Sequence, residues 1–289
     1  MRQHGGVNAW RGCARPLTPT PLPLSGCAGG GEGKARMPDI FHFTAPAHWR
    51  TLDFIADMHL KPQEPRTFAA WQQYLLTTPA DAVFLLGDVF EAWAGDDCTL
   101  PRSFERRCQA VLRAASKRCA LFFMAGNRDF LIGKKFLARA HMQPLPDPTA
   151  LHFGGRRWLL SHGDALCTDD ARYQQFRAQV RAPEWQAAFL ARPLAERLAT
   201  AQHMRQASEA EHAGRGYAQI DETLAAQWLR AADAETLIHG HTHQPGAYEM
   251  GEGLWRVVVS DWHITDSARR LDVLRLTADG LHRIVPDGV

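Results

Sequence analysis

The sequence lacks the features of a membrane-spanning or disulfide-stabilised protein. None of its 289 residues lies in an apolar stretch that approaches the roughly 20 residues needed to span a bilayer. Pro16, Pro21 and Pro23 interrupt the only N-terminal run that could form the apolar part of a signal peptide. The six cysteines include no C-x-x-C pair and are too sparse for a disulfide framework. We therefore expect reduced thiols and a cytoplasmic location.

A strong excess of charge of either sign is also missing. The formal net charge is +2 at pH 7, whereas a protein that binds nucleic acid usually carries a clustered basic surface. With 45% hydrophobic and 22% charged residues, the chain has the balance of a globular protein with a sizeable core. We expect no nucleic-acid partner, and the sequence indicates no particular protein partner.

Residues 1 to 48 show no helical or strand periodicity and are rich in Gly, Pro, Ser and Thr. Such a composition does not bury enough apolar surface to offset the entropy lost on folding. We interpret this segment as a disordered N-terminal extension, followed by one folded domain over residues 49–289. Met37 lies just before the folded part and is an alternative start of translation.

Short apolar runs that end in polar residues begin at Thr51. They predict strands at residues 52–56, 82–86, 120–125, 157–161, 236–239, 255–259, 271–276 and 281–285. Helix-favouring stretches at 65–77 and 103–116 separate the first three of these strands. This alternation indicates βαβ units and an α/β fold.

Polar residues with the chemistry of a site follow five of the predicted strands, namely Asp57, Asp88, Asn127, His162 and His241. Ligands of such sheets bind beyond the carboxyl ends of the strands, so we expect these side chains to share one site. Each residue taken alone has a simpler explanation. The acids and the Asn are common in caps and turns, and a lone His is commonly a surface or core residue. Their convergence at five strand ends favours a functional site.

The residue types indicate a metal centre. Carboxylate, imidazole and amide groups together suit Mn²⁺, Zn²⁺ or Fe²⁺. His59 lies two positions after Asp57, and His243 lies two positions after His241. This spacing places both members of each pair on the same side of an extended chain, where they can hold one ion.

A centre with two ions about 3.5–4 Å apart needs an anion between them to lower the repulsion of the cations. A carboxylate has two oxygens for this purpose, and Asp88 is the candidate. Asn127 offers a neutral oxygen and His162 an imidazole to the second ion.

Residues 165–232 interrupt the alternation of strands and helices. They contain no strand-like run, but favour helices at 171–180, 184–190, 194–210 and 217–232. Because this insertion lies between two strands that carry site residues, we expect it to form a helical cap over the site. Its arginines, which are accompanied by fewer acids, are Arg172, Arg177, Arg181, Arg192, Arg197, Arg205 and Arg215.

Five motifs carry a resemblance to a known family. They are Asp57-Met-His59, Gly87-Asp88, Gly126-Asn127-Arg128-Asp129, His162-Gly163 and Gly240-His241-Thr-His243. Together they resemble the signature of the calcineurin-like metallophosphoesterases and cover the chain from about residue 51 to 264. The resemblance implies two packed β-sheets flanked by helices, here with a helical cap. It also implies two divalent ions, with Mn²⁺ expected, one held by Asp57, His59, Asp88 and His243 and the other by Asp88, Asn127, His162 and His241.

Longer matches, at residues 54–60, 85–97, 126–131, 161–170 and 237–245, resemble one branch of that family. Members of this branch hydrolyse the pyrophosphate bond of UDP-2,3-diacylglucosamine to UMP and 2,3-diacylglucosamine 1-phosphate in lipid A biosynthesis. The resemblance implies attack by a water that two metal ions activate, with Asp88, Asn127, Arg128 and His241 as catalytic residues. Many family members have His at the position of Arg128. A guanidinium does not donate a proton near neutral pH, but it binds phosphate oxygens well.

The resemblance also implies where the substrate binds and where the protein works. The substrate-binding residues would be Asn127, Arg128, Asp170, Ser208, His212, Arg215 and His241. The partner would be a lipid-linked UDP-sugar, and the protein would associate peripherally with the cytoplasmic face of the inner membrane. The cap residues Phe176, Val180, Trp185, Phe189, Leu190, Leu194 and Leu198 either line a groove for acyl chains or pack the helices together. The cap arginines either meet anionic headgroups or form a solvated face.

Two other functions fit parts of the sequence. A phosphodiesterase or phosphatase acting on another nucleotide or on phosphoproteins would use the same metal site, but a small soluble substrate has no need of an amphipathic cap. A non-catalytic scaffold with this fold would have lost metal ligands, whereas all seven candidate ligands are present. The hydrolase of the lipid-linked nucleotide is therefore the favoured function.

Overall fold

The computed structural model describes residues 37–212 and 219–286, with the side chains of residues 206–212 excepted. In this part of the chain the strands form two six-stranded sheets and one two-stranded sheet. The first sheet has the order β14-β13-β2-β3-β4-β5. Its strands are β2 (Leu52–Ile55), β3 (Ala82–Leu86), β4 (Ala120–Met124), β5 (Gln143–Pro144), β13 (Val273–Thr277) and β14 (Gly280–Ile284).

The second sheet has the order β1-β6-β7-β8-β10-β9. Its strands are β1 (Phe41–Thr44), β6 (Thr149–Phe153), β7 (Arg156–Ser161), β8 (Thr236–His239), β9 (Gly246–Glu249) and β10 (Trp255–Val258). Strands β2 to β5 run parallel in the first sheet, and β7, β8 and β10 run parallel in the second. The small sheet pairs β11 (His263–Ile264) with β12 (Arg269–Arg270).

Alternating side chains of the strands build separate layers of the core. Phe54 and Phe84 in the first sheet face a cluster that includes Leu160 and Ile238 of the second sheet. The intervening residues, such as Leu85, belong to a different cluster on the opposite face of the first sheet. This is the period of two expected for strands that are buried on both faces.

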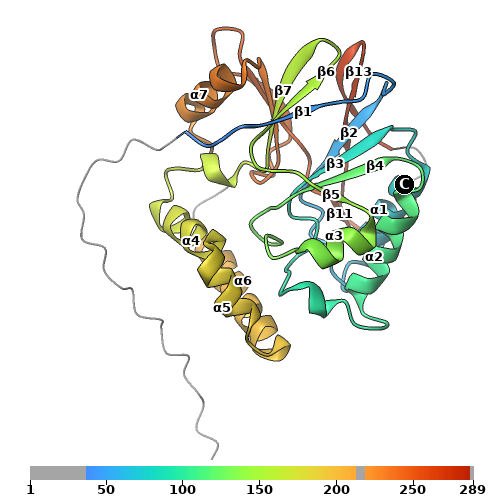
Figure 1. Cartoon of the computed structure of the whole chain (residues 1–289), viewed down its shortest axis with the longest axis vertical. Coiled ribbons are helices and arrows are strands. Elements are labelled where there is room, and N and C mark those ends of the chain that lie inside the picture. Colours follow the sequence, from blue (N-terminus) through green and yellow to red (C-terminus); the bar gives the residue numbers. More distant parts are fainter. Residues whose placement is uncertain (1–36, 213–218, 287–289) are drawn as a thin grey trace, which may run out of the picture. The chain divides into compact units, whose positions relative to one another are not determined.

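Helices cover the outer faces of both sheets. The helices α1 (Pro65–Thr77), α2 (Phe104–Ala115) and α3 (Lys134–Ala140) lie together on one side in Figure 1 and pack against the first sheet. Helix α2 begins where Ser103 Oγ accepts a hydrogen bond from Arg106 N at 3.1 Å, which satisfies one donor of the first turn. Helix α7 (Glu222–Ala232) packs against β7 and β8 of the second sheet.

The insertion between β7 and α7 contains the helices α4 (Ala171–Arg181), α5 (Pro183–Leu190) and α6 (Leu194–His212), which lie side by side in Figure 1. Two short 3₁₀ turns occur at Asp96–Cys98 and Asp164–Leu166. The predicted fold of two β-sheets flanked by helices, with an inserted helical cap, is confirmed.

Two boundaries differ from those predicted. Residues 41–44 were assigned to the disordered extension, but they form β1, and Phe43 packs 4.9 Å from Phe122 between ring centroids. This strand is stabilised by pairing with β6, a distant partner that local composition does not show. Helix α7 was assigned to the cap, but its apolar side chains Leu224, Trp228 and Leu229 join the core of the second sheet. Residues 1–36 of the predicted extension lie outside the described residues.

The cysteines of the described residues form no disulfide. Cys98, Cys108, Cys119 and Cys167 are buried and free. No helix of the described part of the chain is long and apolar enough to cross a membrane.

Candidate metal centre

The candidate ligands lie in loops at the carboxyl ends of strands from both sheets, so the site is where the two sheets meet. Asp57, His59, Asp88, His241 and His243 have positive φ angles, between 45° and 66°. Non-glycine residues rarely adopt this conformation, which costs of order 1–3 kcal/mol each and persists only where the surroundings enforce it. Five such residues in three loops indicate that the surroundings hold the backbone of this site in a strained conformation.

Glycines in the motifs allow these loops to approach each other. A Cβ atom at Gly126 would overlap Asp88 Oδ1 and the Asp88 backbone nitrogen, and one at Gly240 would overlap Asp57 Oδ2. The glycine before Asn127 and the glycine before His241 are therefore required by the space that the two carboxylates occupy.

The first group of candidate ligands consists of Asp57, His59 and His243. Their ligand atoms all lie within 4.8 Å of one another. The Nε2 atoms of His59 and His243 face each other at 3.2 Å. Asp57 Oδ2 accepts a hydrogen bond from His241 N at 2.8 Å, while Oδ1 is buried without a hydrogen-bond partner among the described residues. Nε2 of His243 lies 3.5 Å from this oxygen.

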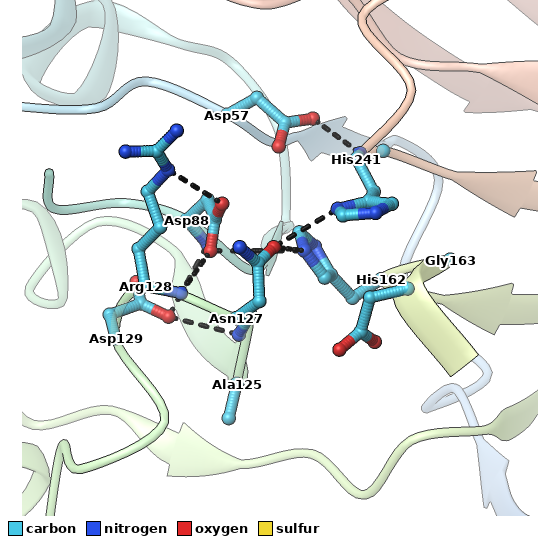
Figure 2. A network of polar contacts seen from close by, with 12 residues as sticks. Asp57, Asp88, Ala125, Asn127, Arg128, Asp129, His162, Gly163 and His241 are labelled. Atoms are coloured by element: carbon cyan, nitrogen blue, oxygen red, sulfur yellow. Dashed lines mark hydrogen bonds and ion pairs between the residues drawn. The ribbon is translucent and has the colours of Figure 1, made fainter. Parts of the chain in front are cut away.

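The second group joins Asp57 to Asp88 and His162, whose ligand atoms also lie within 4.8 Å of one another. Asn127 Oδ1 lies 2.9 Å from His162 Nε2 and 3.0 Å from His241 Nδ1. Figure 2 shows these side chains converging from separate loops. His162 Nδ1 lies 2.9 Å from Leu86 O, so this nitrogen donates to the carbonyl and Nε2 is the nitrogen that faces the site.

These groups fit divalent ions. Two imidazole nitrogens that bind one ion at about 2.0–2.1 Å are roughly 3.0–3.4 Å apart, which matches the spacing of His59 and His243. The buried Oδ1 of Asp57 is an acceptor that a cation would satisfy. Asp57 belongs to both groups, whereas the sequence made Asp88 the bridge. The assignment of individual ligands to each ion stays a prediction.

The charges of the site favour a cation. Burial, together with the charge of Asp57, raises the pKa of Asp88. Burial lowers the pKa of His162, but the charges of Asp88, Asp164 and Asp57 outweigh it and raise that pKa to about 9. For His241, burial and the neighbouring His162 lower the pKa to about 3. Carboxylates that attract a proton to His162 would also attract a divalent ion in its place.

Asp129 ties two of the loops together, a role that the sequence did not assign although the residue ends the Gly-Asn-Arg-Asp motif. Its carboxylate is buried and accepts hydrogen bonds from Val89 N at 2.7 Å and from Gly126 N at 2.9 Å. Asp129 therefore fixes the loop of Asp88 against the loop of Asn127. The signal available in the sequence was the position of Asp129 at the end of the Gly-Asn-Arg-Asp motif.

Arg128 lies beside Asp88 in Figure 2. Its backbone nitrogen donates to Asp88 Oδ1 at 2.8 Å, and its Nε lies 3.7 Å from Asp88 Oδ2. Its Nη1 donates to Glu91 Oε1 at 2.6 Å. The guanidinium is thus held at the edge of the candidate metal centre. Glu91 is a further residue that the sequence did not identify.

The cap is fastened to the site through Asp164, which also had no predicted role. Its buried carboxylate accepts hydrogen bonds from Tyr173 Oη and from Arg177 Nε, both at 2.8 Å. Arg181 of the same helix donates to Gly126 O at 2.9 Å. Helix α4 therefore contacts the backbone just before Asn127.

A cavity of about 280 Å³ extends from the metal centre under the cap. Asn127 and Arg128 line it, and much of the remaining wall is apolar, with Trp93, Phe130, Leu131, Phe176, Trp185 and Phe189. Asp170, Arg172 and Arg205 also line it. Asp170 additionally accepts a hydrogen bond from Tyr173 N at 2.9 Å and begins helix α4.

The cavity includes only some of the predicted groove residues. Phe176, Trp185 and Phe189 line it, whereas Val180 is buried away from it and Leu194 packs against the first core cluster. Leu190 and Leu198 are 40% and 49% exposed on the cap surface. Of the other predicted substrate contacts, Ser208 and His212 belong to α6, but their side chains lie outside the described residues, as does all of Arg215.

A family model and two relatives of similar sequence indicate one family. The family model of the calcineurin-like phosphoesterases matches residues 50–245. UDP-2,3-diacylglucosamine hydrolase of Xanthomonas oryzae pv. oryzae (strain PXO99A) is 42% identical over 79% of this chain and 96% of that protein. The protein with the same name from Chromobacterium violaceum is 44% identical over 73% of this chain and 90% of its own length. The solved structure of Vacuolar Protein Sorting 29 from Cryptosporidium parvum is 15% identical, covers 83% of this chain and 94% of its own, and has a TM-score of 0.43.

Proposed function

The chain belongs to the calcineurin-like phosphoesterase family, and we propose that it hydrolyses the pyrophosphate bond of UDP-2,3-diacylglucosamine to give UMP and 2,3-diacylglucosamine 1-phosphate. The two relatives described above that bear the name of this hydrolase are 42% and 44% identical and extend over 79% and 73% of the chain. The match to the family model, over residues 50–245, spans the seven candidate ligands and the inserted cap.

The choice of substrate rests on one observation, namely that polar and apolar side chains line the same cavity. Asn127 and Arg128, which suit a phosphoryl group, share the cavity with the aromatic side chains Phe176, Trp185 and Phe189 of the cap. A substrate that fills such a space carries phosphate at one end and a large apolar group at the other. An acylated sugar nucleotide has both parts.

We propose two divalent ions, with Mn²⁺ as the metal, held by Asp57, His59, Asp88 and His243 and by Asp88, Asn127, His162 and His241. When bound, the ions would supply Lewis acidity and an activated water. The mixed nitrogen and oxygen donors support a transition metal such as Mn²⁺ over Mg²⁺ or Ca²⁺.

The residues of the chain itself orient the substrate. Arg128 binds the phosphoryl oxygens with several N–H donors and keeps its charge, so it stabilises negative charge without supplying a proton. Asp129 keeps the loops of Asp88 and Asn127 together while charge develops. The aromatic side chains under the cap exclude water from the acyl end of the substrate.

We also propose that the cap meets the cytoplasmic face of the inner membrane, where an acylated substrate would be found. Leu190 and Leu198 are exposed on the cap, and Arg192 lies between them in the sequence. Apolar and cationic side chains together suit the interface of anionic lipids. Replacing both leucines by Ser should reduce sedimentation with anionic vesicles. Sedimentation that equals that of the native chain would contradict this contact.

A comparison of substrates tests the proposed function. The Mn²⁺-loaded protein is given UDP-2,3-diacylglucosamine, the unacylated UDP-N-acetylglucosamine and the simple diester bis(p-nitrophenyl) phosphate in parallel. We expect kcat/KM to be highest for the acylated nucleotide. Faster turnover of the simple diester would instead indicate a general phosphodiesterase.

A further inference from the structure

Glu91 lies where the metal centre, the catalytic arginine and the cap meet. Its side chain is only 11% exposed. Oε1 is 2.6 Å from Arg128 Nη1 and 3.2 Å from Arg205 Nε on α6. Oε2 is 3.5 Å from Lys61 Nζ and 3.9 Å from His59 Nδ1. One carboxylate thus contacts a candidate metal ligand, the arginine beside Asp88 and an arginine of the cap.

The backbone around Glu91 is fixed as well. Glu91 N donates to Leu60 O at 3.3 Å, in the loop after β2. Two residues later, Trp93 N donates to Arg128 O at 3.1 Å. The side chain of Glu91 and the backbone of Trp93 therefore hold Arg128 from two directions. This arrangement restricts the rotamers of a long side chain that would otherwise lose entropy on binding substrate.

The hydrogen-bonding capacity of Arg128 leaves room for a ligand. A guanidinium has five N–H donors, of which Glu91 accepts one and Asp88 lies 3.7 Å from another. Three cations, Arg128, Arg205 and Lys61, face Glu91, and Lys61 is also paired with Glu64 at 2.9 Å.

We propose that Glu91 is a positioning residue for the reaction. It holds the guanidinium of Arg128 toward the phosphoryl group and connects this arginine to Arg205, so that the position of helix α6 is transmitted to the catalytic arginine. The inference rests on the proposed function, because it assumes that Arg128 binds a phosphoryl group of the substrate.

A double-mutant cycle between Glu91 and Arg128 tests the proposal. Glu91→Gln and Glu91→Ala are each made in the native chain and in Arg128→Ala, and kcat, KM and metal content are measured. We expect Glu91→Ala to lower kcat on the order of 10-fold in the native chain, but less than about 2-fold in the Arg128→Ala background. Glu91→Gln keeps an acceptor oxygen and the side-chain size, so its kcat in the native chain should lie between that of the native chain and that of Glu91→Ala. Metal content should stay at the native value.

The matched control is Glu64→Gln, which removes a neighbouring acid that pairs with Lys61, whereas Glu91 is the acid that pairs with Arg128 Nη1; the kcat of this control should equal the native value. Equal losses for Glu91→Ala in both backgrounds would overturn the proposal, and so would a loss of metal in either Glu91 variant. The cycle is run on the acylated nucleotide and on bis(p-nitrophenyl) phosphate. If the diester is hydrolysed and the nucleotide is not, the proposed substrate is contradicted. The kinetics on the diester then still measure the coupling of Glu91 to Arg128.

Discussion

At the residue scale, Asp88 is the carboxylate that we expect to lie between the two metal ions. It lies near His162, accepts a hydrogen bond from Arg128 N and has a φ of 51°. We predict that Asp88→Asn lowers turnover more than about 100-fold, because an amide supplies only one metal-binding oxygen and no charge. Steady-state kinetics checks this, with the exposed Asp279→Asn as the matched control. Turnover within a few-fold of the native value in Asp88→Asn would refute the role of Asp88.

Gly126 offers a steric test of the same centre. A methyl group at this position would overlap Asp88, whereas Gly155 has open space around its hydrogen atoms. We predict that Gly126→Ala lowers turnover roughly 100-fold by displacing the carboxylate, since misplacement of a catalytic group by about 1 Å has such an effect. Gly155→Ala should keep full activity, although its positive φ costs of order 1 kcal/mol of stability. Equal activities of the two variants would contradict the close approach of the loops.

The metal candidates could be predicted from the sequence because each follows a strand in a recognisable motif. Asp129, Glu91 and Asp164 could not be given roles in this way. Their functions depend on which segment lies opposite, for example the loop of Val89 for Asp129 or helix α4 with Arg177 for Asp164. A single carboxylate in a sequence does not indicate its partner, so these positioning contacts emerge only from the folded chain.

At the element scale, helix α6 is fastened to the core by one buried arginine. Arg197 is 2% exposed and donates to Asp97 Oδ1 at 2.9 Å and to Ala94 O. We predict that Arg197→Met raises KM for the acylated substrate roughly 10-fold, since loss of a buried hydrogen-bond partner costs about 1–3 kcal/mol and loosens this wall of the cavity.

Hydrogen exchange provides a second measurement of the α6 contact. Amides of residues 194–205 should exchange faster in Arg197→Met than in the native chain. Arg192→Met is the matched control, because the guanidinium of Arg192 lies over the Phe189 ring, 5.9 Å from its centroid, whereas that of Arg197 binds Asp97. Unchanged exchange and KM in Arg197→Met would show that other contacts hold the cap.

The elements themselves were predictable where local pattern determines them. The helix at 65–77 and the strands at 82–86 and 236–239 have the predicted bounds, because each is a continuous buried or amphipathic segment between turn residues. The short α3 and the edge strand β1 were not predicted, since seven and four residues carry too little periodicity and β1 is stabilised by distant pairing. For α7, periodicity predicted the helix but not the sheet that it covers.

At the scale of the whole molecule, the two sheets are joined at the site by acids and imidazoles that a cation would hold together. We predict that a chelator lowers the thermal midpoint. Readdition of Mn²⁺ at about 100 times its Kd should raise the thermal midpoint again by roughly 5–10 °C, because an ion that binds only the folded chain stabilises the fold. Differential scanning calorimetry measures this change. A midpoint that is independent of chelator and metal would contradict a metal centre between the sheets.

Identification of the bond that is cleaved tests the central claim most directly. Phosphorus NMR and mass spectrometry identify the products that the Mn²⁺-loaded native chain forms from UDP-2,3-diacylglucosamine. The proposed reaction at the pyrophosphate predicts UMP and 2,3-diacylglucosamine 1-phosphate in equal amounts. Formation of UDP with the free acylated sugar, or no turnover while bis(p-nitrophenyl) phosphate is hydrolysed, would contradict it.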